Sequence, residues 1–486
     1  MTITQPGVTA LWDELCSRVN RGDRFAGLFA TKPEGGPLVL SAHLAVKGGG
    51  EVRGAIRGGI DTLDAPLPPG AVSYPALTPR LGAAFWYERV IHDRFGVIPD
   101  GHPRLAPLIR PGSPEEHALP RHVEGYGIFT IPHGPVRSGV MESIEYLVET
   151  PGEAIPHLNM RVFYKYRGVE DRFAGMSTAD AVLLAERTEG IASVAHALAF
   201  CHAVEKIADC QIPPAAGLVR VLHAELERIA GHLDVAVRLA DAAGLAVATA
   251  RFALHKERVL RLVSALCGSR FGRGVVVPGG VGALPLLPPA QILAEADRLG
   301  QAVTADAAAL MATSSFLDRL RGTGPLTPAR ARQHSALGPI GKAAGFADDA
   351  RLSRPYDGYP SLAVPPAPAH AAGDALARLR VRWDEVDQAF GLIRRAADDL
   401  SAERATDLPR VACEPTSGRA VGWAEAPQGE VLYDVLLHEG RIVHCHPRSA
   451  SFHNLVLMHE VFSGDILTDF PFIEASFGLS VAGVAQ

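Results

Sequence analysis

The chain has 486 residues, which excludes a single small module because domains hold roughly 100 to 200 residues each. Hydrophobic residues make up 47% and charged residues 21% of the sequence, so the chain can bury a core and we expect no extended disorder. Lysine and arginine number 47 against 53 aspartates and glutamates, and the net charge of -6 argues against a protein that binds nucleic acid through its phosphates.

Cysteine usage and the N-terminus bear on the cellular compartment. No CxxC pair occurs, which argues against a disulfide framework or a zinc ribbon and favours reduced thiols. Asp13 and Glu14 stand where a signal peptide would be apolar, so we expect a cytoplasmic protein. No window reaches the roughly 18 uninterrupted apolar residues of a membrane span, so membrane association is expected to run through a partner. The cysteines are Cys16, Cys201, Cys210, Cys267, Cys413 and Cys445.

Residues 1–112 are predicted to form a small α+β domain. Alternating apolar residues over Gly36–Val46, followed by a Gly-rich turn at 47–50 and a second run, predict a hairpin. Residues 78–95 carry apolar side chains at three- and four-residue spacing and predict a helix. A proline-rich, charged stretch then breaks both periodicities, and we place a linker at 113–122.

Residues 123–486 are predicted to form a second, mainly helical domain with a small N-terminal β-sheet, so the fold class is α+β. Apolar stripes over residues 218–240 and 376–397 predict two long helices that pack side by side in a bundle. Residues 322–368 are rich in Gly, Pro and Ala and predict a long irregular excursion. The runs that predict the sheet are 128–131, 143–148 and 160–164.

A C-terminal hairpin and a group of histidines end the chain. Alternation over residues 431–437 and a turn at Glu439 and Gly440 predict the hairpin. His444 and His446 share one face of its second strand, as metal ligands would. Because no carboxylate or cysteine stands at ligand spacing, surface hydrogen bonds are the simpler interpretation. The histidines of this region are His438, His444, His446, His453 and His459.

Two pairs within the predicted helices are candidates for chemistry. Cys201 and His202 are neighbours and therefore point about 100° apart on a helix, which favours a structural cysteine over a nucleophile and base. Glu225 and Arg228 lie three residues apart and can pair along a helix. An ion pair, solvated or between helices, is the simpler interpretation of that pair, and a proton relay is the alternative.

Two separate stretches resemble known families. Residues 73–109, with the pattern E-R-x-x-x-D-x-F-G at 88–96, resemble the end of the complex I C subunit. Residues 186–207, together with ELERIAGHL at 225–233 and VVVPGGV at 275–281, resemble the complex I D subunit and the large subunit of membrane-bound NiFe hydrogenases. The two blocks occur in the order found in fused large subunits of the formate hydrogenlyase and hydrogenase-4 type.

The hydrogenase branch of this family binds nickel and iron through four cysteines in two CxxC motifs. The resemblance places Glu189 and Ala192 at the first motif, and Ser480 and Gly483 at the second. A carboxylate, a hydroxyl and two groups without donors cannot replace four thiolates. We therefore expect no metal in this chain and no activation of hydrogen.

The complex I branch uses the corresponding cavity for a quinone head group, to which a histidine and a tyrosine donate hydrogen bonds. Here Arg137 occupies the histidine position, with His133 four residues earlier, and Gly190 occupies the tyrosine position. The acid that supports the histidine has no aligned counterpart, since Asp241 is one position short. The candidate residues of a modified quinone-like cavity are His133, Arg137, Glu189, Gly190 and His196.

The resemblance implies a metal-free large subunit of a complex I-like or hydrogenase-related oxidoreductase, peripheral on the cytoplasmic side of the inner or plasma membrane. Its expected partners are a small subunit carrying an iron–sulfur cluster and membrane subunits that translocate ions, with no nucleic acid. As a subunit rather than a catalyst alone, it would couple electron transfer, to quinone or another small acceptor, to ion transport. The alternative is a redox-silent assembly and coupling subunit whose cavity is filled by side chains, and a working NiFe hydrogenase comes third.

Overall fold

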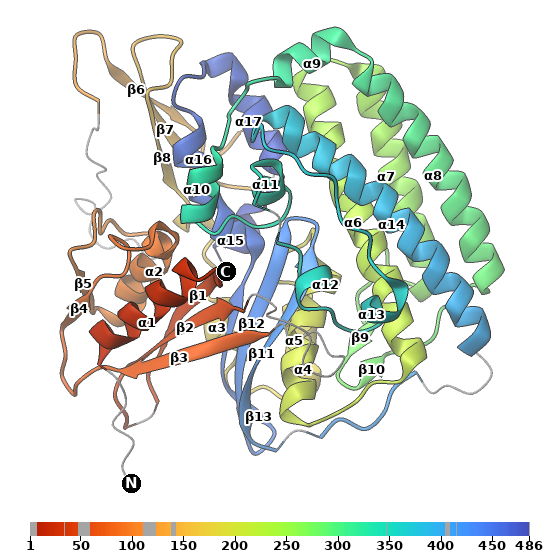
Figure 1. Ribbon diagram of the computed structural model, residues 1–486, viewed down its shortest axis with the longest axis horizontal. Coiled ribbons are helices and arrows are strands. Elements are labelled where there is room, and N and C mark those ends of the chain that lie inside the picture. The colour runs from red at the N-terminus through yellow and green to blue at the C-terminus, as the bar shows by residue number, and fades with distance from the viewer. Residues whose placement is uncertain are drawn as a thin grey trace.

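The computed structural model describes residues 7–33, 35–46, 59–109, 123–137, 142–346, 348–403, 409–414 and 416–485. It is an α+β fold in which a bundle of long helices, a central C-terminal sheet and a smaller N-terminal sheet lie beside one another (Figure 1). This confirms the predicted fold class. No helix in the described part of the chain has both the length and the apolar character to cross a membrane.

The N-terminal part consists of an antiparallel sheet with one helix packed on it. Strands β1 (Arg24–Thr31), β2 (Val39–Ala45) and β3 (Ile60–Pro66) pair in that order, and α1 (Val8–Asn20) contributes Leu11, Trp12 and Leu15 to the core beneath. The predicted hairpin is the β2–β3 pair, and its predicted turn at 47–50 lies outside the described residues. A short parallel pair follows, β4 (Ser73–Pro75) with β5 (Ile98–Asp100).

The helix predicted from residue 78 starts later. After a 3-10 turn, η1 (Gly82–Ala84), α2 runs over Phe85–Phe95. The buried Glu88 carboxylate accepts hydrogen bonds from the backbone N–H groups of Leu77 and Thr78, at 2.7 and 2.9 Å. The Glu88 side chain of α2 thus holds the preceding segment against the helix, so that this segment does not extend the helix toward the N-terminus.

A second antiparallel sheet follows the segment that joins the two parts. It contains β6 (Phe129–His133), β7 (Glu145–Thr150) and β8 (His157–Arg161), in agreement with the three predicted runs. The last run ends earlier than predicted, because residues Phe163–Lys165 turn into a 3-10 helix, η3. This sheet lies beside α16 and α17 in Figure 1.

The helical bundle forms the largest apolar core of the described residues. The predicted stripes lie on α6 (Pro214–Ala242) and α14 (Ala375–Glu403), which pack against each other, while α7 (Ala246–Cys267) packs on α6 and α8 (Pro289–Met311) on α14. Figure 1 shows the four helices side by side. Of the shorter helices, α5 (Ser193–Ile207) contacts α6 and α9 (Ser314–Leu320) contacts α8 and α14, while α4 (Thr178–Ala185) packs on α5 and α3 (Val169–Phe173) on strand β13 (Arg441–Arg448).

The excursion predicted at residues 322–368 is broken by short helices. They bring the buried charged side chains of Lys342, Asp349 and Arg351 into the bundle. The sequence did not predict this, because charged residues add nothing to an apolar periodicity. The short elements of this part are β9 (Val276–Val277), β10 (Gly280–Val281), α10 (Pro328–Gln333), α11 (Gly338–Ala343), α12 (Ala350–Ser353) and α13 (Tyr359–Leu362).

The C-terminal hairpin is part of a three-stranded sheet. Strands β12 (Gly429–His438) and β13 (Arg441–Arg448) form the predicted hairpin, and β11 (Gly418–Ala426) adds an unpredicted strand beside β12. Helix α5 packs closely on β11, where a Cβ atom on Gly422 would overlap the carbonyl oxygen of Ala199. The chain ends in α15 (Ala450–Leu455), α16 (Met458–Val461), η4 (Leu467–Asp469), α17 (Phe470–Phe477) and α18 (Val481–Val484).

The C-terminal histidines are not all surface residues, contrary to the simpler interpretation. His446 and His453 are 6% and 3% exposed and lie where the N-terminal part meets the C-terminal sheet and α15. The Tyr87 hydroxyl lies 2.7 Å from Nδ1 of His453, and the hydroxyl of Thr31 lies 3.0 Å from Nε2 of His446. Imidazoles serve as polar groups within a buried contact because they can pair with hydroxyls there.

Candidate functional site

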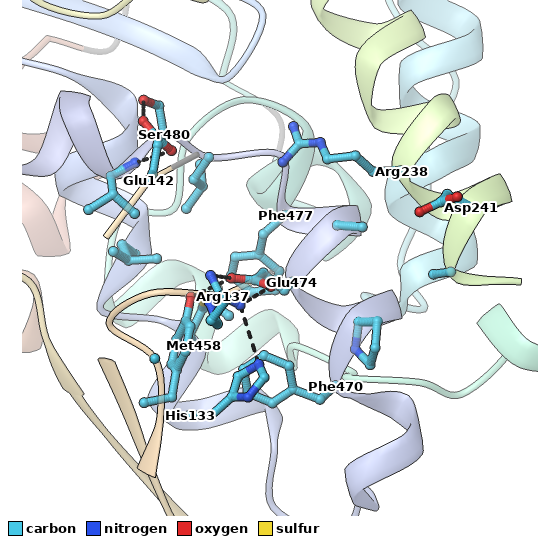
Figure 2. A pocket seen from close by; sticks show the side chains of 18 of the residues that line it. His133, Arg137, Glu142, Arg238, Asp241, Met458, Phe470, Glu474, Phe477 and Ser480 are labelled. Carbon is cyan, nitrogen blue, oxygen red and sulfur yellow. Dashed lines mark hydrogen bonds and ion pairs between the residues drawn. The ribbon is translucent and has the colours of Figure 1, made fainter. Parts of the chain in front are cut away.

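An open cavity of about 880 Å³ lies where β6, α6, α17 and the segment before α18 meet (Figure 2). The end of β6 and the loop after it contribute His133 and Arg137, α6 contributes Arg238 and Asp241, and α17 contributes Glu474. The site therefore combines three parts of the sequence that are far apart. Further lining residues include Pro132, Glu142, Tyr146, Asp234, Met458, Phe470, Phe477 and Ser480.

Arg137 and Glu474 form a two-point ion pair on the cavity wall. Nη1 and Nη2 of Arg137 donate to the two carboxylate oxygens of Glu474 at 2.8 and 2.7 Å, and the Tyr146 hydroxyl donates to the same carboxylate at 2.9 Å. The guanidinium also lies 5.1 Å from the centre of the Tyr146 ring. Such bidentate contacts fix the direction of both side chains as well as their distance.

His133 lies beside this pair, with Nε2 3.5 Å from Nη1 of Arg137. Partial burial and the neighbouring Arg137 charge lower the pKa of His133, so the imidazole is neutral at pH 7. Burial, followed by the charge of Glu474, raises the pKa of Tyr146 well above its usual range, and its hydroxyl keeps its proton. The wall thus offers a neutral imidazole, a phenol and a compensated guanidinium.

Glu142 holds the last segment of the chain at the edge of the cavity. Its carboxylate accepts hydrogen bonds from the Ser480 hydroxyl at 2.5 Å and from the backbone N–H groups of Val481 and Ala482 at 2.8 and 2.9 Å. The bond between Glu142 and Ser480 is visible in Figure 2. The first backbone N–H groups of a helix have no partner within the helix, and the Glu142 carboxylate satisfies these donors at the start of α18.

Glu189 and His196 lie behind the cavity wall, where they are 1% and 0% exposed. The Glu189 carboxylate accepts a hydrogen bond from Ser451 at 2.5 Å and lies 3.2 Å from Nε2 of His196. The other ring nitrogen of His196 is 2.9 Å from the Tyr433 hydroxyl. These side chains form a continuous buried chain of polar groups rather than part of the open surface.

The other candidate positions do not lie together in the open cavity. Gly190 lines a small pocket of about 80 Å³ beside His223 and Glu227, and not the open cavity. Ala192 is fully buried before α5. Gly483 packs against Glu189, since a Cβ atom there would lie 2.5 Å from Cδ of Glu189. Of the candidates, His133, Arg137 and Ser480 therefore line the open cavity.

The positions that the resemblance assigns to metal ligands do not fit a nickel–iron centre. They supply the Glu189 carboxylate and the Ser480 hydroxyl, and both already form hydrogen bonds within the protein. Such a centre requires thiolates, which bind soft metals. Among the residues that the structure describes, no group of three or more His, Cys, Asp or Glu side chains is arranged to hold a metal ion.

The predicted ion pair of Glu225 and Arg228 belongs to a buried charge network between helices. Glu225 lies 3.1 Å from Arg228 and 3.1 Å from Arg351, and Glu385 of α14 accepts from His232 and Lys342 at 2.8 and 2.7 Å. All members are at most 5% exposed. The ion-pair interpretation is therefore confirmed, in its interhelical form.

Sequence reasoning missed Glu142, Tyr146 and Glu474. Tyr146 and Glu474 meet although 328 positions separate them in the sequence. The sequence held one signal for Glu474, which is the single acidic residue in the apolar run FPFIEASF. A charge among so many apolar residues needs a partner when it is buried.

Two protein-family models and several known proteins are similar to this chain. Residues 243–416 match the family described as "Respiratory-chain NADH dehydrogenase, 49 Kd subunit", and residues 60–126 match the corresponding 30 Kd subunit. Formate hydrogenlyase subunit 5 of Escherichia coli is 27% identical over 83% of this chain and 75% of that protein. An NADH-quinone oxidoreductase subunit of Syntrophobacter fumaroxidans is 28% identical over 70% of this chain and 92% of that protein.

A solved structure agrees at the level of the fold. A chain of the membrane-bound sulfane sulfur reductase, an archaeal respiratory membrane complex, superposes with a TM-score of 0.69 at 22% identity, over 74% of this chain and 99% of that chain. Both subunit families of complex I thus match in the order predicted from the motifs, and the fold agrees. The chain is related to the 49 kDa and 30 kDa subunits of complex I and to the large subunits of membrane-bound hydrogenases.

Proposed function

We propose that this chain is the large peripheral subunit of a membrane-associated oxidoreductase complex, and that its open cavity receives the head of a quinone or a similar carbonyl-bearing acceptor. A partner subunit with an iron–sulfur cluster supplies the electrons, and membrane subunits couple the reaction to ion transport. The proposal rests on the matches to respiratory and hydrogenase subunits, together with a cavity of about 880 Å³ at the position where the resemblance places a quinone site.

The observation that carries the proposal is the set of side chains around Arg137. A carbonyl acceptor that takes two electrons also takes two protons when it becomes a hydroquinone. His133 is exposed on the cavity and its imidazole can pass on a proton, while the Arg137 guanidinium can donate hydrogen bonds to a reduced oxygen without losing its charge. In the proposed site, Arg137 takes the place of the histidine that donates a hydrogen bond in the complex I branch. Arg137 keeps its proton, so we assign proton transfer to His133.

Two contacts favour the alternative, a redox-silent assembly subunit. Arg137 directs one N–H of each terminal nitrogen to Glu474, which leaves it only its remaining N–H groups for a ligand, and the buried Glu189 carboxylate packs against Gly483. In the redox function, an acceptor has to compete with Glu474 for Arg137. In the silent function, the ion pair only fastens the β6 loop to α17.

The two functions are separated by photolabelling of the native complex, purified through a tag on this chain under mild detergent. A photoreactive quinone analogue is irradiated with the complex, with and without excess unlabelled quinone. The redox function predicts co-purified iron–sulfur and membrane subunits and a label on the cavity segments 132–137 or 470–481 that quinone suppresses. A complete complex without displaceable label would establish the silent function, and a chain that purifies alone would contradict both.

A further inference from the structure

Two cysteines that are distant in the sequence meet at the end of α5. Cys210 follows this helix, and its thiol donates to the carbonyl oxygen of Ala412 at 3.9 Å. This contact places Cys210 beside the residue that precedes Cys413, and the nearby Cys210 thiol helps to raise the pKa of Cys413. Both cysteines are partly exposed and reduced. The pair lies apart from the open cavity, whose lining contains neither residue.

The backbone on both sides holds the two thiols in place. The N–H of Cys210 donates to the Glu205 carbonyl at 2.9 Å, which closes the end of α5. On the other side, Val411 donates to the Gly279 carbonyl at 3.0 Å, and a Cβ atom on Gly279 would lie 3.1 Å from Cβ of Cys413. The Cys413 side chain therefore packs against the turn at Gly279.

The pair is also open to small molecules from one side. Cys210 lines a groove of about 780 Å³ together with Lys206, Asp209 and Asp357. Burial, followed by the neighbouring Cys210, raises the pKa of Cys413 to about 12. Because Cys210 lines the groove and Cys413 does not, a reagent bound in the groove meets Cys210 first.

We propose that Cys210 and Cys413 form a reversible disulfide that fastens the segment before β11 to the end of α5. A small-molecule disulfide such as oxidised glutathione is the oxidant. The Cys210 sulfur attacks one sulfur of the reagent, which forms a mixed disulfide and releases one glutathione thiol carrying the proton. Cys413 then attacks the Cys210 sulfur, breaks the mixed disulfide and releases the second glutathione, so two protein thiols are oxidised and one small disulfide is reduced to two thiols.

The link joins residues that are 203 positions apart in the chain, so it restricts the unfolded chain strongly. Oxidation is therefore expected to raise the midpoint of thermal unfolding by a few degrees, and a reducing dithiol should reverse the shift. This inference does not depend on the proposed redox function, because it concerns thiols outside the open cavity.

The test treats the purified full-length protein with oxidised glutathione and maps its peptides without reduction. The proposal predicts a Cys210–Cys413 peptide pair, a loss of two reactive thiols and a reversible rise of the unfolding midpoint. Cys413→Ser should abolish all three, while Cys267→Ser should abolish none, because the Cys267 thiol donates to the backbone carbonyls of Val263 and Ser269.

Three outcomes would overturn the proposal. The first is a native protein that keeps all its thiols under oxidation, and the second is a mixed disulfide on Cys210 that Cys413 never resolves. The third is a link from Cys413 to the buried Cys201, whose pKa the Cys413 charge also influences. Because the peptide map of the parent protein distinguishes these results, the test does not depend on the folding of any variant.

Discussion

Glu189 and Gly483 lie in direct contact, so closely that a Cβ atom on Gly483 would come within 2.5 Å of Cδ of Glu189. The resemblance assigns one of these positions to each of the two metal-binding motifs of the hydrogenase branch. In this chain a carboxylate and a glycine meet there, with Ser451 and His196 as the hydrogen-bonding neighbours of the carboxylate.

Gly483→Ala is expected to destabilise the protein, because the added methyl group meets the Glu189 carboxylate in a buried contact. Overpacking of this kind costs about 1 to 3 kcal/mol in the free energy of unfolding. Denaturant unfolding measures the change. Gly190→Ala is the matched control, since no heavy atom lies within 4 Å of a Cβ atom built there. Equal effects of the two substitutions would show that the contact is not as close as described.

The ion pair of Arg137 and Glu474 is expected to stabilise the fold, since its two side chains are only 7% and 26% exposed. A double-mutant cycle with Arg137→Gln and Glu474→Gln should give a coupling free energy of about 1 to 2 kcal/mol, above that of an exposed pair. The exposed pair of Arg261 and Glu257 provides the comparison, and its coupling should be clearly smaller. A coupling near zero for Arg137 and Glu474 would mean that the pair does not fasten the β6 loop to α17.

Lys342→Met is expected to lower the free energy of unfolding by about 3 to 5 kcal/mol, because it leaves two buried carboxylates without their shared cation. Lys342 donates to Asp349 and Glu385, both at 2.7 Å. Although burial acts to raise it, the charge of Lys342 helps to hold the pKa of Glu385 well below its usual range. Lys256→Met, at a lysine that is 35% exposed and pairs with Asp234, should cost less than about 1 kcal/mol. Similar losses in both variants would contradict a role for burial.

Stability is expected to fall as the pH falls from about 6.5 to about 4, and His446 is one cause. Burial lowers the pKa of His446 to about 4, whereas an unfolded histidine titrates near 6.5. Between these values the unfolded chain binds a proton that the folded chain excludes, so folding loses up to about 3 kcal/mol at this residue. The contribution is fully present above pH 6.5.

The measurement is the midpoint of thermal unfolding of the parent protein and of His446→Gln at a series of pH values. The variant keeps a polar group near Thr31 but cannot take up the proton, so its pH dependence should be shallower in this window. Parallel curves for the two proteins would contradict a buried neutral imidazole at the contact between the N-terminal part and β13.

Helices and strands could be predicted from the sequence where a single physical signal, such as the spacing of apolar residues, determines them. The apolar stripe of residues 218–240 predicts α6 because a helix that buries one face must repeat at 3.6 residues. Strand β11 escaped prediction because both of its faces are covered near Gly422, so apolar and polar residues do not alternate along it. The late start of α2 depends on Glu88, whose side chain acts on residues ten positions earlier.

The candidate site was predictable only in part. The resemblance pointed to His133 and Arg137 together, since only four positions separate them and their proximity needs no knowledge of the tertiary fold. Glu474 completes that site from a distant helix, and a single sequence carries no signal for the pairing. Glu189 was expected on the cavity, but its contact with Gly483 places it behind the wall.

The central claim is that the cavity around Arg137 receives an electron acceptor. The most direct measurement is the rate at which a soluble quinone oxidises the iron–sulfur partner of the purified native complex, after the complex has been reduced with dithionite and freed of the excess reagent. We expect the parent complex to reduce the quinone and Arg137→Gln to raise KM roughly tenfold, because the loss of a charge-assisted hydrogen bond costs about 1.5 kcal/mol or more. The exposed variant Arg261→Gln should keep the KM of the parent. A fully assembled complex that reduces no quinone, or one whose KM is unchanged by Arg137→Gln, would contradict the account.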